Sequence, residues 1–303
     1  MIVGFTMTEI TKFKKHVSEN QLLRKQEPTE NLGFLKRTLL VGSVVLISSF
    51  ASFSQVPTDV KPPEALKNRI KLEEQDKHRK SNGKYALIVI GELEERFIIS
   101  ATIAYDTLVE NGFNPKNIYV LSDYGDKRSS YPVDGSANKE TMKLVLDHLS
   151  KTMNKKSRFV LYMHDHGELK PFKVDGSDDR YENLPAFRLG YKFIGVSELQ
   201  TMVSNIEAKR EIFVFDFCLD GSFAEALGKG NVVALSSDPD NKLSHSDFLH
   251  SFSGYFFDAF RKGYRPNKKR ISVEDAYNFS KSHDGHNRPR IFGDIDPNKV
   301  TLK

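Results

Sequence analysis

The sequence predicts an α/β protein whose mainly parallel β-sheet carries helices on both faces. From residue 84 onward, short apolar runs typical of buried strands alternate with segments whose apolar side chains recur at helical spacing. Helices between strands form right-handed crossovers, which place consecutive strands parallel to one another. Two of these strands also end in polar turns that contain glycine, and ligands of parallel sheets bind beyond the carboxyl ends of the strands.

Three strands and two helices are predicted in the first half of this region. Each strand is a continuous apolar run of buried type, and each helix has one apolar face. The first helix stops at Gly112, a residue type that favours the end of a helix. In chain order the elements are a strand at 85–91, a helix at 100–111, a strand at 117–122, a helix at 139–153 and a strand at 159–163.

The second half continues this alternation after a long loop. The same two patterns predict a helix at 196–206, a strand at 212–217, a short helix at 223–227, a strand at 232–235, helices at 247–262 and 273–280, and a short strand at 289–293. We interpret the polar segments 123–138 and 170–189 as exposed loops, a kind of segment that can cover a substrate or be cleaved.

The net charge of +5 does not indicate a nucleic-acid-binding domain, because of where the charge lies. Residues 1–82 hold 14 Lys and Arg against 9 Asp and Glu, whereas the rest of the chain holds 31 of each. A nucleic-acid-binding domain carries a basic stripe on its folded part, and none is evident here. The hydrophobic content of 39% across 303 residues is enough for a substantial core.

Residues 39–54 form an apolar segment typical of a secretory signal. Lys36 and Arg37 precede it, small residues close it, and it is short for a membrane-spanning helix. The polar stretch before it is too long for an ordinary signal peptide, which leaves two explanations. Either translation begins near Leu35, or the segment is an uncleaved anchor with a cytoplasmic tail. We expect an exported protein, periplasmic or secreted, that contacts a membrane only if residues 39–54 are retained.

These features divide the chain into three regions: a targeting region at 1–54, a polar linker at 55–83 and a folded domain at 84–303. The linker contains three prolines and a charged tract without an apolar face, so at most a solvated helix is expected at 64–80.

Cys218 is the only cysteine, and it follows the predicted strand at 212–217. Most free cysteines are small buried hydrophobic residues, so that reading stays open. Two observations favour a nucleophile instead. The residue lies at the carboxyl end of a strand, and a single unpaired thiol in an oxidising compartment is a hazard unless its reactivity is used.

A histidine suited to activate this thiol follows the preceding strand. Imidazole is the natural base at neutral pH, and His166, next to Gly167, is the stronger candidate for that role. His164 is expected to be a supporting or an exposed residue, and Asp165 to orient an imidazole or to be exposed. The backbone N–H groups of Gly167 and Cys218 are candidate donors to an oxyanion.

A metal site is not expected. His164, His166, His245 and His250 lack a recognised ligand spacing, and the sequence contains no phosphate-binding loop or dinucleotide-binding motif. We therefore expect neither a metal nor a cofactor.

The two motifs resemble those of the legumain (asparaginyl endopeptidase) family of caspase-like cysteine peptidases, which includes the catalytic subunit of the glycosylphosphatidylinositol transamidase. Asp165-His166-Gly167 after the third strand, and the turn around Cys218 after the fourth, carry the resemblance. The resemblance covers residues 84–294. It implies a caspase-like three-layer sandwich, a His166–Cys218 dyad with Gly167 and Cys218 as oxyanion donors, and a protein or peptide substrate bound through Arg96, Ser236 and Ser237.

Several residues depart from the family pattern. Leu219 and Asp220 stand where polar and serine residues are usual, and Phe97 replaces a histidine after the pocket arginine. We expect Asp220 to bring a negative charge close to the thiol, which would oppose thiolate formation. Two functions therefore remain open. The first is a cysteine endopeptidase or transpeptidase, and the alternative is a catalytically inactive caspase-like domain that binds a peptide or partner protein in the same groove.

Overall fold

The computed structural model describes residues 62–75, 83–92, 94–122, 131–173, 181–239, 251–261 and 270–303. The chain divides into two compact units, Met1–Val56 and Pro57–Lys303, and every described residue belongs to the second. The predicted targeting segment at 39–54 lies outside the described residues, as do His245 and His250. Among the residues that are described, no helix has the length and apolar character needed to cross a membrane.

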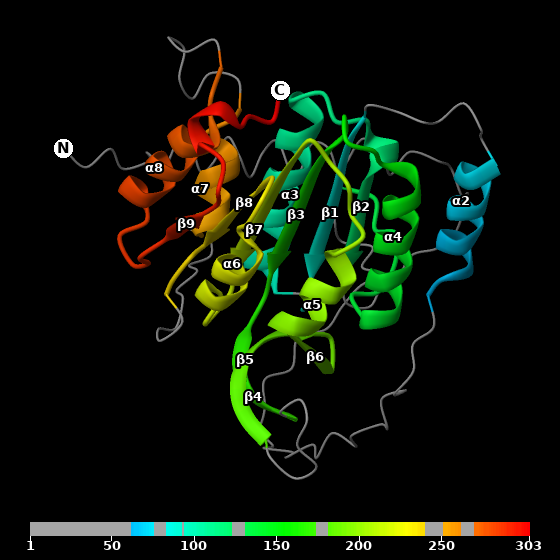
Figure 1. Ribbon diagram of the computed structural model, residues 1–303, viewed down its shortest axis with the longest axis horizontal. Coiled ribbons are helices and arrows are strands. Elements are labelled where there is room, and N and C mark those ends of the chain that lie inside the picture. The colour runs from blue at the N-terminus through cyan, green and yellow to red at the C-terminus, as the bar shows by residue number, and fades with distance from the viewer. Residues whose placement is uncertain are drawn as a thin grey trace, which may run out of the picture. The chain divides into compact units, whose positions relative to one another are not determined.

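A six-stranded sheet forms the centre of the second unit (Figure 1). Its strand order is β2-β1-β3-β7-β8-β9, in which the first five strands are parallel and β9 is antiparallel to β8. The parallel strands are buried along their length except for the first residue of three of them, as expected for a sheet covered on both faces. The strands are β1 Lys84–Ile90, β2 Ile118–Ser122, β3 Arg158–His164, β7 Arg210–Asp216, β8 Val232–Ser236 and β9 Arg290–Phe292.

Helices cover both faces of this sheet, which makes the unit a three-layer α/β sandwich and confirms the predicted fold class of a mainly parallel sheet flanked by helices. Alternate strand residues enter separate cores: Leu87 and Val89 pack with α4, α5 and α6, whereas Ala86 and Ile88 pack with α3, α7 and α8. In Figure 1, α5 and α6 lie in front of the sheet and α3 lies behind it. The helices are α3 Glu95–Glu110, α4 Lys139–Thr152, α5 Val196–Val203, α6 Gly221–Leu227, α7 Phe252–Asp258 and α8 Val273–His283.

The helix in the predicted linker is packed against the domain, so the expectation of a solvated segment is wrong. This helix, α2, spans Glu64–Gln75, and its Leu66 and Ile70 are 2% and 5% exposed in the same core as α4. Glu73, one turn further along the same side of the helix, accepts a hydrogen bond from Tyr119 and pairs with His148. Two apolar residues at i and i+4 are a narrow stripe, which is why the sequence pattern did not reveal the contact.

A second, three-stranded antiparallel sheet occupies the predicted long loop between β3 and α5. It is formed by β4 Gly167–Lys173, β5 Tyr181–Leu189 and β6 Lys192–Gly195. The prediction of an exposed loop at 170–189 is therefore wrong for the described part of that segment. β4 alternates buried or half-buried with exposed residues, and the first four residues of β5 are exposed. Polar, half-exposed strands of this kind resemble loops in sequence.

Most other differences from prediction concern the ends of elements. α3 begins at Glu95 rather than at residue 100, and α5 ends at Val203 rather than at 206. α7 occupies the centre of the predicted helix at 247–262, whose first four residues lie outside the described part of the chain. Two short 3-10 helices, Pro115–Asn117 and Pro297–Lys299, were not predicted.

Candidate active site

The two motifs singled out in the sequence leave neighbouring strands at the same edge of the main sheet. β3 ends at His164 and β7 ends at Asp216, and these two residues are partners in the register of the strands. His166 and Cys218 each follow that pair by two positions. The main chains touch at this point, since a Cβ atom added to Gly167 would overlap the carbonyl oxygen of Cys218. The structure therefore places both motifs at one point on the carboxyl edge of the sheet.

Cys218 lies on a tight turn between β7 and α6, and it is half-buried. The turn passes through Leu219, whose φ of 67° is the only positive φ among the described non-glycine residues. This conformation costs an L-residue roughly 1–2 kcal/mol. Strained backbone of this type is concentrated at functional sites, where it fixes the direction of a neighbouring side chain.

His166 is held by residues from the start of α3. Its Nε2 lies 2.8 Å from Glu94 Oε1 and 3.4 Å from an Arg96 guanidinium nitrogen, and its ring packs edge-on against Phe97. The shorter contact is to a carboxylate, which only accepts hydrogen bonds, so we assign the proton of the neutral ring to Nε2 and leave Nδ1 as the acceptor nitrogen. Arg96, which only donates, is then a neighbour of Nε2 and not its hydrogen-bond partner. Burial alone raises the pKa of Glu94, but hydrogen bonds from His166 and Arg96 outweigh it and lower that pKa.

Glu92, Glu94 and His166 form the one described group of side chains whose ligand atoms lie close enough together to hold a metal ion, within 4.8 Å. Both carboxylates already have cationic partners. Glu92 pairs with Arg188 at 2.6 Å, and Glu94 pairs with Arg96 at 2.7 Å. Each arginine contacts the carboxylate oxygen other than the one that approaches His166, so the group forms an ion-pair network around the imidazole.

His164 points into the protein and cannot act from an exposed position. It is 1% exposed, its Nδ1 lies 2.9 Å from the Tyr162 hydroxyl, and its Nε2 lies 3.8 Å from Asp216. Burial lowers the pKa of His164, although Asp216 acts in the opposite direction. Asp216 itself accepts hydrogen bonds from the backbone N–H and the hydroxyl of Ser253. His164 is therefore a supporting residue, and the alternative of an exposed one is wrong.

Asp165 is also buried, at 4% exposure, and no hydrogen bond joins it to an imidazole nitrogen of the described residues. One of its oxygens accepts a hydrogen bond from the backbone N–H of His166, and the other packs against Gly91. Burial raises the pKa of Asp165 to about 8 despite that hydrogen bond. Asp165 thus fixes the main chain that carries His166 rather than its ring.

Asp220 does not present an open charge to the thiol, as the sequence led us to expect. Its carboxyl group is fully buried and accepts hydrogen bonds from the backbone N–H groups of Phe217, Ser237 and Asp238 and from the Ser237 hydroxyl. Burial raises the pKa of Asp220 well above its ordinary value, which further reduces its negative charge. The residue ties the Cys218 turn to the end of β8.

The three residues assigned to substrate binding lie around this edge in different states. Arg96 stacks on the Phe97 ring at 4.5 Å and is partly exposed beside His166. Ser236 and Ser237 are both fully buried; the hydroxyl of Ser237 binds Asp220, and that of Ser236 has no hydrogen-bond partner among the described residues. Their role in binding a substrate stays a prediction.

Glu94 is the residue at this site that sequence reasoning missed. A signal for it was present, because Glu94 follows β1, and β1 is the neighbour of β3 in the sheet. Loops after adjacent parallel strands meet at one edge, so an acidic residue after β1 lies near a histidine after β3. The order of strands is needed for that inference, and the sequence alone does not provide it.

No family model matches the chain, and no curated protein matches it. Among solved structures, the chain is similar to the crystal structure of protein GSU0716 from Geobacter sulfurreducens, with a TM-score of 0.53 and 15% sequence identity. The similarity covers 72% of this chain and 97% of that one. At this level of identity the similarity establishes the fold alone.

Proposed function

We propose that this protein is a cysteine endopeptidase or transpeptidase that acts through Cys218 and His166. The observation that carries the proposal is the contact between the Gly167 main chain and the Cys218 carbonyl, because it joins the imidazole-bearing loop to the thiol-bearing turn. The resemblance to the legumain family supports the same assignment. Its two motifs are expected after the third and fourth strands, and here they follow the third and fourth strands of the main sheet.

The proposed reaction begins with transfer of the thiol proton to Nδ1 of His166. The sulfur then attacks the carbonyl carbon of a peptide bond, and the C–N bond breaks as the imidazolium returns its proton to the leaving amine. A water molecule, or a second amine, completes the cycle by attacking the thioester and releasing the thiol. The Nε2 hydrogen bond to Glu94 orients the ring and stabilises the imidazolium that forms between these steps.

The Gly167 amide suits the role of an oxyanion donor for a geometric reason. Gly167 pairs with Phe187 in the β4–β5 ladder, and the bond from Arg188 N–H to the His166 carbonyl makes that pair a non-hydrogen-bonded one. The ladder therefore leaves the Gly167 N–H unused. A free backbone donor beside a nucleophile is what a developing oxyanion requires.

The test of this proposal is labelling of Cys218 by iodoacetamide or a peptidyl acyloxymethyl ketone. Because Cys218 is the only cysteine, one label per chain identifies the site without ambiguity. We expect rapid labelling near neutral pH, and at least roughly a hundredfold slower labelling of His166→Ala, the usual size of a general-base contribution. His286→Ala, which changes an exposed histidine, is the control. Slow labelling that is indifferent to His166 would favour the inactive, peptide-binding alternative.

Replacing Glu94 is expected to weaken the same reactivity without removing it. Glu94→Ala deletes the acceptor for Nε2–H, so the ring loses its fixed tautomer and orientation, and labelling should slow by roughly tenfold to a hundredfold. Glu94→Gln keeps an oxygen acceptor and should recover part of the loss. Glu95→Ala, which changes the exposed neighbouring glutamate, is the matched control. Equal rates for Glu94→Ala and the control would remove Glu94 from the mechanism.

Export is part of the proposal, and so is the protein or peptide substrate. The proposal of export rests on the apolar segment at 39–54, and sequencing the amino terminus of the mature protein tests it. A mature chain that begins after residue 54 would establish cleavage, whereas an intact chain in the membrane fraction would establish an anchor. An intact chain in the soluble cytoplasm would contradict export.

A further inference from the structure

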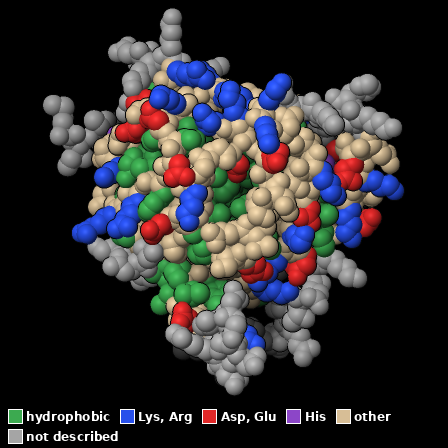
Figure 2. Space-filling model, in the orientation of Figure 1, with side chains coloured by type: hydrophobic (Ala, Val, Ile, Leu, Met, Phe, Trp, Pro, Cys, Tyr) green, Lys and Arg blue, Asp and Glu red, His purple; other side chains and the backbone are tan. Residues whose placement is uncertain are grey.

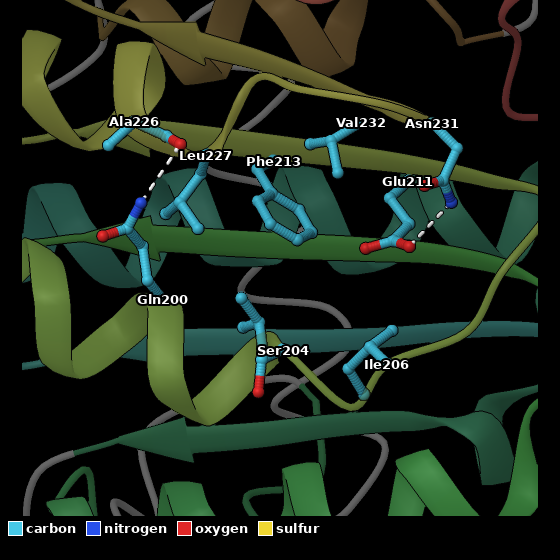
Figure 3. A pocket seen from close by; sticks show the side chains of 10 residues that line it. Gln200, Ser204, Ile206, Glu211, Phe213, Ala226, Leu227, Asn231 and Val232 are labelled. Atoms are coloured by element: carbon cyan, nitrogen blue, oxygen red, sulfur yellow. Dashed lines mark hydrogen bonds between the residues drawn. The ribbon is translucent and has the colours of Figure 1, made fainter.

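A small cavity lies at the opposite end of the main sheet from Cys218, between α5, α6 and the first residues of β7 and β8 (Figure 3). Its volume is about 260 Å³. Figure 2, drawn in the same orientation as Figure 1, shows apolar side chains in the middle of the face that carries α5 and α6. Apolar and polar side chains both line it: six of the ten lining residues are apolar, and the other four are polar. The lining residues are Gln200, Val203, Ser204, Ile206, Glu211, Phe213, Ala226, Leu227, Asn231 and Val232.

Glu211 is the chemically unusual member of this lining, because it is a buried carboxyl group without a cation. It is 4% exposed, and its Oε1 accepts a hydrogen bond from the Asn231 side chain at 2.8 Å. No described Lys, Arg or His forms an ion pair with it, and its second oxygen has no hydrogen-bond partner among the described residues. Burial raises the pKa of Glu211 to about 7. Buried carboxylates in proteins are normally paired or neutral, so this group is suited to receive a positive charge from outside.

We infer that this cavity binds a primary ammonium group at the end of an unbranched alkyl chain, as in a lysine side chain or a free alkylamine. The volume is below the roughly 300–1,000 Å³ of typical cofactor and drug pockets, so it suits a single side chain rather than a larger ligand. The aliphatic stem packs against Val203, Leu227 and Val232, and the ammonium donates to the free oxygen of Glu211. Lysine commonly buries its stem and directs its charge to a polar partner in this way.

The site is separate from the proposed catalytic chemistry. Glu211 is the second residue of β7, whereas Cys218 follows the other end of that strand, roughly 20 Å away at the rise of a β-strand. The ammonium site therefore stands even if the peptidase proposal fails. In a peptidase it would hold a lysine of the substrate or of a partner protein far from the bond being cleaved.

Binding is tested by NMR titration of the full chain, following the methyl signals of Val203 and Val232. The probes are n-pentylamine, a peptide with one lysine (acetyl-Gly-Lys-Gly-amide), and n-pentanol as an uncharged probe of the same length. We expect saturable shifts with at least one of the two ammonium probes and much smaller shifts with the alcohol. Binding of both would indicate that the alkylammonium alone is sufficient, and binding of the peptide only would identify lysine within a chain as the ligand.

Glu211→Gln keeps the shape and the acceptor for Asn231 but removes the charge, so it should weaken binding at least tenfold. Glu207→Gln, which changes an exposed glutamate four residues earlier, should leave it unchanged. Glu211 is the only titratable residue among the ten that line the cavity, and wild-type affinity should therefore rise from pH 6 to pH 8 as its carboxyl ionises. Equal affinity for pentanol and pentylamine in the wild type, or no shift with either ammonium probe, would overturn the inference.

Discussion

Gly167→Ala is expected to lower the reactivity of Cys218 by at least about a hundredfold, the cost of displacing a catalytic group by roughly 1 Å. The new Cβ would overlap the backbone carbonyl oxygen of Cys218 and come within 2.9 Å of the Phe217 ring. A main-chain carbonyl cannot rotate aside as the end of a flexible side chain can. We therefore expect the loop that carries His166 to move away from the thiol.

The measurement is the rate of Cys218 labelling, together with circular dichroism and thermal unfolding to verify that the variant is folded. Gly285→Ala is the matched control, because a Cβ at Gly285 meets no atom within 4 Å. A folded Gly167→Ala protein that is labelled at the wild-type rate would show that the contact between the two loops has no part in activating the thiol.

The five parallel strands of the main sheet were predictable because burial on both faces requires continuous apolar runs. Such runs are rare outside buried strands and are bounded here by polar turns. Most helices that cover the sheet were predictable from their single apolar face, as in α4 and α8. Sequence reasoning failed for α2, whose buried stripe consists of Leu66 and Ile70, and for the three-stranded sheet, whose residues are largely exposed.

Three residues show what the sequence could and could not predict about the candidate site. Cys218 and His166 could be singled out, because each follows a recognisable strand. The direction of the Asp220 side chain could not, because it depends on backbone N–H groups at the end of β8. The sequence places Asp220 two residues from the thiol, yet the left-handed turn at Leu219 separates these neighbours in orientation. Adjacency in the chain is therefore a poor guide to electrostatics on a strained turn.

Asp220→Ala is expected to lower the free energy of unfolding by roughly 2–5 kcal/mol, because it removes a buried hydrogen-bond acceptor that several donors share. The substitution removes the carboxyl acceptor of the Phe217 and Asp238 N–H groups, whereas the Ser237 N–H keeps its bond to the Phe215 carbonyl. Each unpaired buried donor costs about 1–3 kcal/mol, and local rearrangement offsets part of the sum. Because these groups join the Cys218 turn to β8, the labelling rate of Cys218 should fall as well.

Asp220→Asn should have an intermediate effect, because the two carboxyl oxygens accept unequal numbers of bonds. Oδ2 accepts from Phe217, from the Ser237 N–H and from the Ser237 hydroxyl, whereas Oδ1 accepts only from Asp238. If the asparagine oxygen takes the place of Oδ2, three of the four hydrogen bonds are kept. Its NH₂ group then faces the Asp238 N–H, and two donors cannot form a hydrogen bond. Urea denaturation measures the free energy of unfolding of the wild type, Asp220→Ala and Asp220→Asn. The control is Asp147→Ala, which breaks a surface ion pair to Lys143 and should lower the free energy of unfolding by no more than about 1 kcal/mol. If Asp220→Ala costs no more than this control, the carboxyl group does not brace the turn, and the placement of Cys218 must depend on the packing of α6 instead.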